Sequence, residues 1–147
     1  MMEQAIMMGS FIVRKLAESK NISDKLYNQP LVMRAYPATD QIADLFNRHK
    51  IVELYEVKDG TSVTEPLQYV VNQIIHSFVF EFIFEGPNKV FGVAFNSDHS
   101  KKKRLFMLPL DKIIGAFAKC GNYYPESMTA LRINDGSEWE IVLDDDC

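Results

Sequence analysis

The chain has 147 residues, of which 47% are hydrophobic and 24% are charged, and its formal net charge at pH 7 is −4. This length and composition are typical of one soluble globular domain with a sizeable core, and they exclude an intrinsically disordered chain. The acidic balance argues against a protein whose whole surface binds nucleic acid, so any basic contact patch has to be local.

The first part of the chain is predicted to contain a helix and a strand. Apolar residues at mostly helical spacing predict a helix over residues 3–20. The segment 31–36 is short and apolar, which favours a strand. Pro37 is expected to end this strand because proline has no N–H for a central ladder.

Two further elements are predicted before residue 60. Apolar residues at positions i, i+3 and i+4 predict a helix over residues 40–49, and Thr39 is its expected N-cap. The side chains expected on the buried face of this helix are Ile42, Leu45 and Phe46. The segment 51–57 is predicted to form a strand, which a turn at 58–60 ends.

The centre of the chain changes from helical to strand periodicity. An apolar stripe over residues 67–75 predicts a helix that begins near Thr64. The period becomes two in the segment 77–85, which predicts a strand with four aromatic rings on one face. These rings are expected to form the floor of the core, and they belong to Phe78, Phe80, Phe82 and Phe84. The segments 89–95 and 104–110 are predicted to continue as an antiparallel meander.

A helix and a hairpin are predicted to complete the fold. Asp111 is positioned to cap a helix over residues 112–120, and Gly121 follows it directly. The segments 129–133 and 138–143 are predicted to pair as a hairpin. The sequence Asn134-Asp135-Gly136 between them is typical of a tight turn.

The predicted order of elements gives the α+β class. Consecutive hairpins require antiparallel pairing, so we expect a mainly antiparallel sheet of about six to seven strands with three to four helices on one face. Gly92 is expected to mark a β-bulge or to admit a bulky group such as an aromatic ring from a neighbouring strand, and Gly115 is expected to pack tightly on the sheet. No break in composition divides the chain, so residues 1–147 are predicted to form a single domain with an acidic tail at 144–147.

The cysteines and the N-terminal segment predict a cytoplasmic protein. Cys120 and Cys147 lie far apart, and the second is the last residue, where a structural disulfide is uncommon. The apolar run after Glu3 lacks the positive flank and the cleavage site of a secretory signal. The run is also shorter than the roughly 20 residues that span a bilayer, so we expect no membrane association.

A basic loop lies between two of the predicted strands. Its residues are Lys101, Lys102, Lys103 and Arg104. Contact with nucleic-acid phosphates is one interpretation. The other interpretation is that the lysines protect a hairpin tip from pairing with other chains. No aromatic residue alternates with the lysines to stack on bases, which favours the second interpretation.

Catalytic, cofactor and metal sites have no signature in the sequence. Ser97, Asp98 and His99 are adjacent on one loop, whereas the members of a catalytic triad usually come from separate segments. His49 and His76 lack the spacing of a metal site, and no glycine-rich phosphate loop is present. We therefore expect no enzyme activity, no cofactor and no bound metal.

Two other groups of residues are candidate contacts. Acidic residues gather at the end of the chain and could speed association with a basic partner. They are Glu138, Glu140, Asp144, Asp145 and Asp146. Aromatic and polar residues of scattered segments are the candidates for a small-ligand pocket. They are Tyr55, His76, Tyr123 and Tyr124.

The leading hypothesis is a small acidic binding protein, without enzyme activity, that inhibits, neutralises or adapts a macromolecular partner, which we expect to be another protein. Immunity proteins and phage-encoded inhibitors share this general character, although the similarity is one of composition only. The alternatives are an enzyme or ligand-binding protein with a scattered pocket, and nucleic-acid binding by the basic loop. The first helix, rich in methionine, either closes the core or binds a second copy of the chain through residues such as Met1, Met2, Met7, Met8, Phe11 and Ile12.

Overall fold

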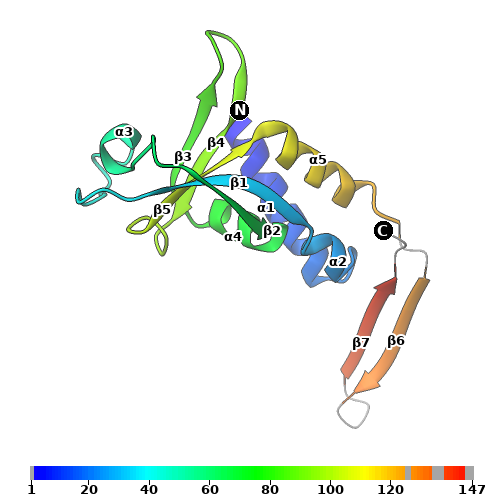
Figure 1. The fold of residues 1–147 in the computed structure, drawn as a ribbon. Helices are drawn as coiled ribbons and strands as arrows, with labels where there is room; N and C mark the ends of the chain where they lie inside the picture. The colour runs from blue at the N-terminus through cyan, green and yellow to red at the C-terminus, as the bar shows by residue number, and fades with distance from the viewer. Residues whose placement is uncertain (1, 125–126, 134–137, 145–147) are drawn as a thin grey trace.

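The computed structural model describes residues 2–124, 127–133 and 138–144, and it confirms the α+β class (Figure 1). The helices are α1 (Met2–Glu18), α2 (Asp24–Tyr27), α3 (Ile51–Leu54), α4 (Leu67–Ile75) and α5 (Leu110–Gly121). The strands are β1 (Pro30–Pro37), β2 (Thr61–Pro66), β3 (Ser77–Phe84), β4 (Val90–Ser97), β5 (Arg104–Pro109), β6 (Ser127–Ile133) and β7 (Glu138–Asp144).

The strands form two antiparallel sheets. The larger sheet has the order β2-β1-β5-β4-β3, so that β2 and β3 are its edges. Among the described strands, β6 and β7 pair with each other alone, and Figure 1 shows this hairpin projecting away from the larger sheet. The turn predicted between them lies outside the described residues.

The helices α1, α4 and α5 form a layer on one face of the larger sheet (Figure 1). The apolar stripe of α4 is buried as its spacing predicts, and its members are Leu67, Val70, Val71 and Ile74. Gly9 lets α1 approach α5, because a Cβ atom at this position would lie 2.6 Å from the ring of Phe117. None of the helices in the described part of the chain combines the length and the apolar character needed to span a bilayer.

The prediction for residues 40–57 is wrong. Residues 40–50 form turns and bends, α3 is a single short helix, and Tyr55 forms an isolated bridge with Ala38. Side chains of the segment bind the backbone locally: Asp44 Oδ1 accepts from Phe46 N at 2.8 Å, and Asn47 Oδ1 accepts from Asp44 N at 2.7 Å. Such bonds compete with helical ones and so favour turns.

A strand and two helix starts also differ from the prediction. Thr64 lies in β2, a polar edge strand that strand periodicity does not reveal, and Pro66 occupies the N-cap of α4. Pro109, rather than Asp111, occupies the N-cap of α5. Gly121 is the last residue of α5 and Asn122 is its C-cap.

The four phenylalanines of β3 do not share one buried face. Phe80 and Phe82 pack against the core below the helices, as expected. A register shift between Ser77 and Val79 places Phe78 in a second core cluster, and Phe84 at the strand end is 60% exposed. The second cluster consists of Leu54, Tyr55, Phe78, Val79, Ala94 and Leu105. A β-bulge therefore interrupts the alternation that the sequence suggests.

The two internal glycines behave differently. A Cβ atom at Gly92 would lie 2.5 Å from the carbonyl oxygen of Leu108, so the close neighbour is the backbone of β5 and not an aromatic ring. A Cβ atom at Gly115 would have no neighbour within 4 Å. The expectation of tight packing at Gly115 is therefore wrong.

Candidate interaction surface

In the part of the chain that the structure describes, the connection between β1 and β2 holds most of the highly exposed apolar side chains. We define residues 39–54 as the apolar loop. Its exposed side chains and their exposed fractions are Ile42 (78%), Leu45 (70%), Phe46 (88%) and Val52 (76%). Among the described residues, only Tyr124 (89%) exceeds these values for a large apolar side chain. A group of neighbouring apolar side chains that are exposed to solvent is typical of an interaction surface.

Hydrogen bonds close the apolar loop at its base. Thr39 N donates to the carbonyl oxygen of Leu54 at 2.8 Å, and Thr39 Oγ1 donates to the carbonyl oxygen of Glu53 at 2.8 Å. Ala38 N donates to the carbonyl oxygen of Lys103 at 2.9 Å, and Ala38 also bridges to Tyr55. The two ends of the loop are therefore held together and joined to the basic loop just before β5.

The tip of the apolar loop is also fixed by its own side chains. Besides the two bonds of Asp44 and Asn47 given above, Asn47 Nδ2 donates to the carbonyl oxygen of Ile42 at 2.9 Å. Arg48 N donates to the carbonyl oxygen of Asp44 at 3.1 Å. The loop thus presents its apolar side chains from a backbone with a defined shape, which lowers the entropic cost of binding.

A buried tyrosine joins the apolar loop to the sheet. Tyr55 is 1% exposed, and its hydroxyl donates to the carbonyl oxygen of Lys101 at 2.9 Å and accepts from Asn96 Nδ2 at 2.6 Å. Asn96 Oδ1 accepts from Val79 N at 3.1 Å. Burial raises the pKa of Tyr55 above its usual value. One network therefore connects the apolar loop, β3, β4 and the basic loop.

Two of the four cationic side chains of the basic loop contact other side chains of the fold. Lys101 Nζ lies 3.0 Å from Asp98 Oδ1 and 4.2 Å from the ring centroid of Phe78. The guanidinium of Arg104 lies 4.6 Å from the ring centroid of Phe106 and 3.5 Å from the carboxylate of Glu65.

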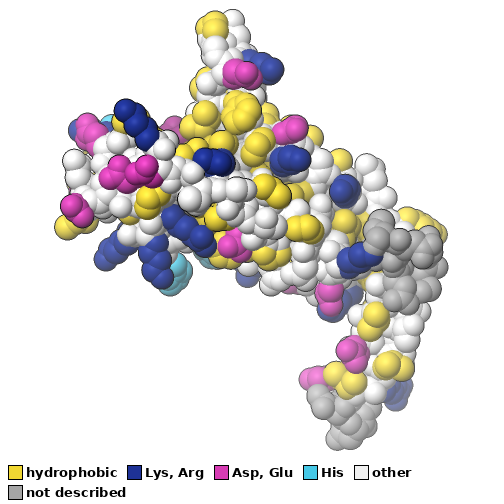
Figure 2. Space-filling view, in the orientation of Figure 1, with side chains coloured by type: hydrophobic (Ala, Val, Ile, Leu, Met, Phe, Trp, Pro, Cys, Tyr) yellow, Lys and Arg dark blue, Asp and Glu magenta, His cyan; other side chains and the backbone are white. Residues whose placement is uncertain are grey.

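The remaining two residues of the basic loop face solvent. Lys102 and Lys103 are exposed and have no ion pair among the described residues. Figure 2 shows cationic side chains where the connection between β4 and β5 lies in Figure 1. Only two lysines therefore remain for a phosphate contact, which keeps nucleic-acid binding the weaker alternative.

The neighbouring serine of the same loop has a structural role. Ser97 is buried, its N–H donates to Gln73 Oε1 at 3.1 Å, and its hydroxyl lies 3.3 Å from that of Ser100. Ser97 thus fastens the loop to α4. No histidine contact of Ser97 is found within the described part of the chain, and the triad is not formed.

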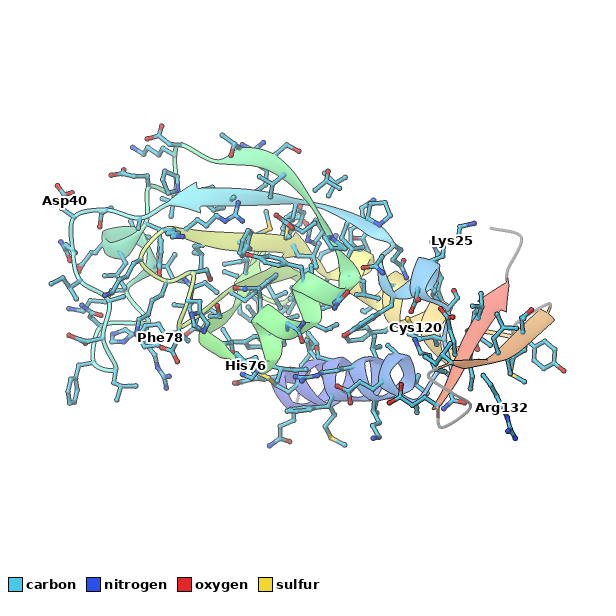
Figure 3. The ribbon with its side chains drawn as sticks, turned by 90° about the horizontal axis from the view of Figure 1, so that it is seen from below. Lys25, Asp40, His76, Phe78, Cys120 and Arg132 are labelled. Carbon is cyan, nitrogen blue, oxygen red and sulfur yellow. The ribbon has the colours of Figure 1, made fainter. Side chains whose placement is uncertain are left out.

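The four residues proposed for a small-ligand pocket lie in different environments. Tyr55 belongs to the second core cluster, whereas Tyr123 packs against the helix-side core. His76 is exposed at the C-cap of α4 and lies apart from the α5 end near Cys120 (Figure 3), and Tyr124 is 89% exposed. The described contacts do not bring these side chains together.

The acidic candidates lie on the projecting hairpin. Glu138 and Glu140 are exposed on β7, opposite Ile133 and Leu131 of β6. Asp144 is the last residue of β7, while Asp145 and Asp146 lie outside the described residues. The acidic surface at this end of the chain stays a prediction.

The first helix exposes the side chains that suggested contact with a second copy. Met8 is 63% exposed, Phe11 56% and Ile12 55%, whereas Met7 packs against the core. Met1 lies outside the described residues. The helix therefore closes the core with one face and exposes apolar side chains on another, and contact with a second copy stays a prediction.

The buried thiol and the possible metal ligands were also compared with the predictions from the sequence. Cys120 is buried, and burial raises the pKa of its thiol to about 11, so that the reactive thiolate is disfavoured. Within the described ranges, no group of three or more His, Cys, Asp or Glu residues is arranged to hold a metal ion.

A groove lies beside the apolar loop at the edge of the larger sheet. It has a volume of ≈ 360 Å³ and is lined by residues 77–81 of β3, by Glu3 of α1 and by Arg48 of the apolar loop. No sequence pattern predicted this groove, because its walls come from three distant segments.

Comparisons with known proteins give no function that could be transferred to this chain. No protein-family model matches the sequence, and neither a curated protein nor a solved structure matches it.

Proposed function

We propose that the protein is a non-enzymatic binding protein that holds a partner protein through the apolar loop and thereby inhibits, neutralises or adapts it. One observation carries the proposal: four large apolar side chains of this loop, led by Phe46 at 88%, are 70% or more exposed on a backbone that local hydrogen bonds fix. A partner that covers such side chains removes apolar area from water at about 25 cal/mol per Å².

The chemistry of the apolar loop supports a protein partner. Large apolar and aromatic side chains supply most of the binding energy at protein interfaces, and charged residues form the rim. Within the loop, Asp40, Arg48 and Lys50 are exposed beside the apolar residues. Exposed apolar side chains with both charge signs nearby in the same loop suit a protein surface better than a nucleic acid.

The test uses matched phenylalanine variants. Wild-type protein is mixed with host lysate fractions, co-eluting proteins are identified by light scattering and mass spectrometry, and the recovered partner is purified for titration. We expect Phe46→Ser to weaken the affinity by about tenfold or more, as for an interface hot spot. Phe11→Ser, which removes an exposed ring from α1, should change it less than about twofold.

Three results would contradict the proposal. A wild-type protein that retains no partner is the first, and an unchanged affinity of Phe46→Ser is the second. A larger loss for Phe11→Ser than for Phe46→Ser is the third, because it would move the contact to α1. Thermal melting controls for folding, since replacing either exposed ring should alter stability by less than about 0.5 kcal/mol.

A further inference from the structure

The two edges of the larger sheet differ in how they are protected against pairing with another chain. The edge strand β2 has the sequence TSVTEP, which is mostly polar and ends in proline. The edge strand β3 has the sequence SFVFEFIF, with neither proline nor lysine and with a single charged residue, Glu81. Natural edge strands usually carry such protective residues, so β3 is unusually open to strand addition.

The backbone of β3 has hydrogen-bonding groups on its outer side. Val79 N donates inward to Asn96 Oδ1 of β4 at 3.1 Å. Because successive residues of a strand direct their N–H and C=O groups to opposite sides, Phe80 and Phe82 direct theirs outward. Among the described residues, no other strand pairs with this side of β3.

The groove described above lies along this open edge. Its two walls are Glu3, from the helix layer, and Arg48, from the apolar loop on the opposite face. Neither side chain forms an ion pair within the described part of the chain. The edge thus offers a row of backbone groups between two unpaired charges of opposite sign.

We infer that this groove binds an extended segment of the partner protein, which adds to the sheet as a strand alongside β3. Side chains of successive residues in such a segment point to opposite faces of the sheet, so one set faces Arg48 and the other set faces Glu3. The segment therefore carries an acidic residue in the first set and a basic residue in the second, separated by an odd number of positions. The inference rests on the proposed function, because Arg48 belongs to the loop that holds the partner.

The groove suits a single extended chain better than a second copy of this protein. The groove along the β3 edge is lined on one side by Glu3 of α1 and on the other side by Arg48 of the apolar loop. A second copy would bring its own helix and loop against these two walls. A peptide segment brings only its backbone and side chains, which the ≈ 360 Å³ groove admits.

The test uses a phage-displayed library of random eight-residue peptides as the probe. Selected peptides are synthesised, and their affinities are measured by fluorescence polarisation. We expect selected sequences to carry opposite charges at odd spacing. Arg48→Glu should weaken binding by about tenfold, whereas Lys58→Glu, the same charge change in the same connection between β1 and β2 but outside both the apolar loop and the groove lining, should stay within about twofold.

N-methylation of the peptides tests strand addition itself. Methyl groups on every second amide, those that face β3, should abolish binding, because these amides supply the hydrogen bonds of the new strand. Methyl groups on the intervening amides should leave binding within about threefold. A peptide that binds only through its side chains would show no such alternation.

Several outcomes would overturn the inference. They are a library that yields no binder, equal losses for Arg48→Glu and Lys58→Glu, and a methylation pattern without alternation. Light scattering could also show a dimer that the added peptides do not dissociate. If Phe82→Asp abolished this dimer, the β3 edge would be assigned to a second copy of the chain. The proposed function fails separately, through the Phe46→Ser titration with the purified partner, whatever the peptides show.

Discussion

Removal of one buried hydroxyl group should loosen the base of the apolar loop. In Tyr55→Phe, the carbonyl oxygen of Lys101 loses its 2.9 Å donor and Asn96 Nδ2 loses its 2.6 Å acceptor. Asn96 Nδ2 keeps a longer contact, 3.3 Å, with the carbonyl oxygen of Arg104. A lost hydrogen bond costs about 1 kcal/mol, and a buried group left without a partner costs about 1 to 3 kcal/mol. We therefore expect the free energy of unfolding to fall by about 2 kcal/mol.

Urea unfolding followed by circular dichroism measures this change. A fall of about 2 kcal/mol corresponds to a decrease in Tm of roughly 4 to 8 °C for a chain of this size. Tyr36→Phe is the matched control, because Tyr36 packs against the same core cluster and its hydroxyl has no hydrogen bond within the described part of the chain. We expect its free energy of unfolding to change by less than about 0.5 kcal/mol.

A Tyr55→Phe variant as stable as wild type would refute the reasoning. Such a result would mean that the hydroxyl of Tyr55 contributes no net stability and that the apolar loop is held by other contacts. A fall for both variants would instead assign the effect to the ring environment rather than to the hydrogen bonds.

Three other substitutions follow from packing and from burial. Gly92→Ala places a Cβ atom 2.5 Å from the carbonyl oxygen of Leu108 and should destabilise the protein by roughly 1 to 3 kcal/mol. In Gly115→Ala the new Cβ atom meets no atom within 4 Å, so the substitution should stabilise α5 by about 0.5 to 1 kcal/mol. Urea unfolding of both variants measures the change in the free energy of unfolding. A change of the same sign in both variants would contradict the packing described. The pKa of the Cys120 thiol is raised by burial from 9.0 to about 11, so the unfolded chain loses this proton at lower pH than the folded protein does. The contribution of this thiol to the free energy of unfolding is therefore complete below pH 9 and is lost as the pH rises from 9 to 11. Urea unfolding over this range should show a steeper fall for wild type than for Cys120→Ala, and identical slopes would contradict a buried neutral thiol.

Local periodicity was sufficient to predict an element from the sequence where one face of that element packs against the core. The apolar stripe of α4 and the alternation in β4 identified these two elements, and β5 was predicted as the next strand of the same antiparallel meander because the connection is short. The sequence could not show where a strand departs from its alternation. The bulge near Phe78 depends on pairing with β4, which is a contact between segments distant in the sequence.

The sequence pattern led to a wrong prediction for the apolar loop, which is the candidate interaction surface. Ile42, Leu45 and Phe46 have the spacing of a buried helix face, and this pattern predicted burial where the structure exposes all three side chains. Whether an apolar side chain faces the core or water depends on which elements lie beside it. The same limit applies to the groove, because Glu3 and Arg48 meet β3 only in the folded chain.

Photo-crosslinking at position 46 tests the central claim most directly. Phe46 is replaced by benzoylphenylalanine, which keeps an aromatic side chain at the tip of the apolar loop, and Phe11 is replaced in the same way as a control. Both variants are irradiated with the purified partner, and the products are separated by electrophoresis. We predict a covalent complex with the partner from position 46 and none from position 11. A complex from position 11 alone, or from neither position while the partner is bound, would contradict binding through the apolar loop.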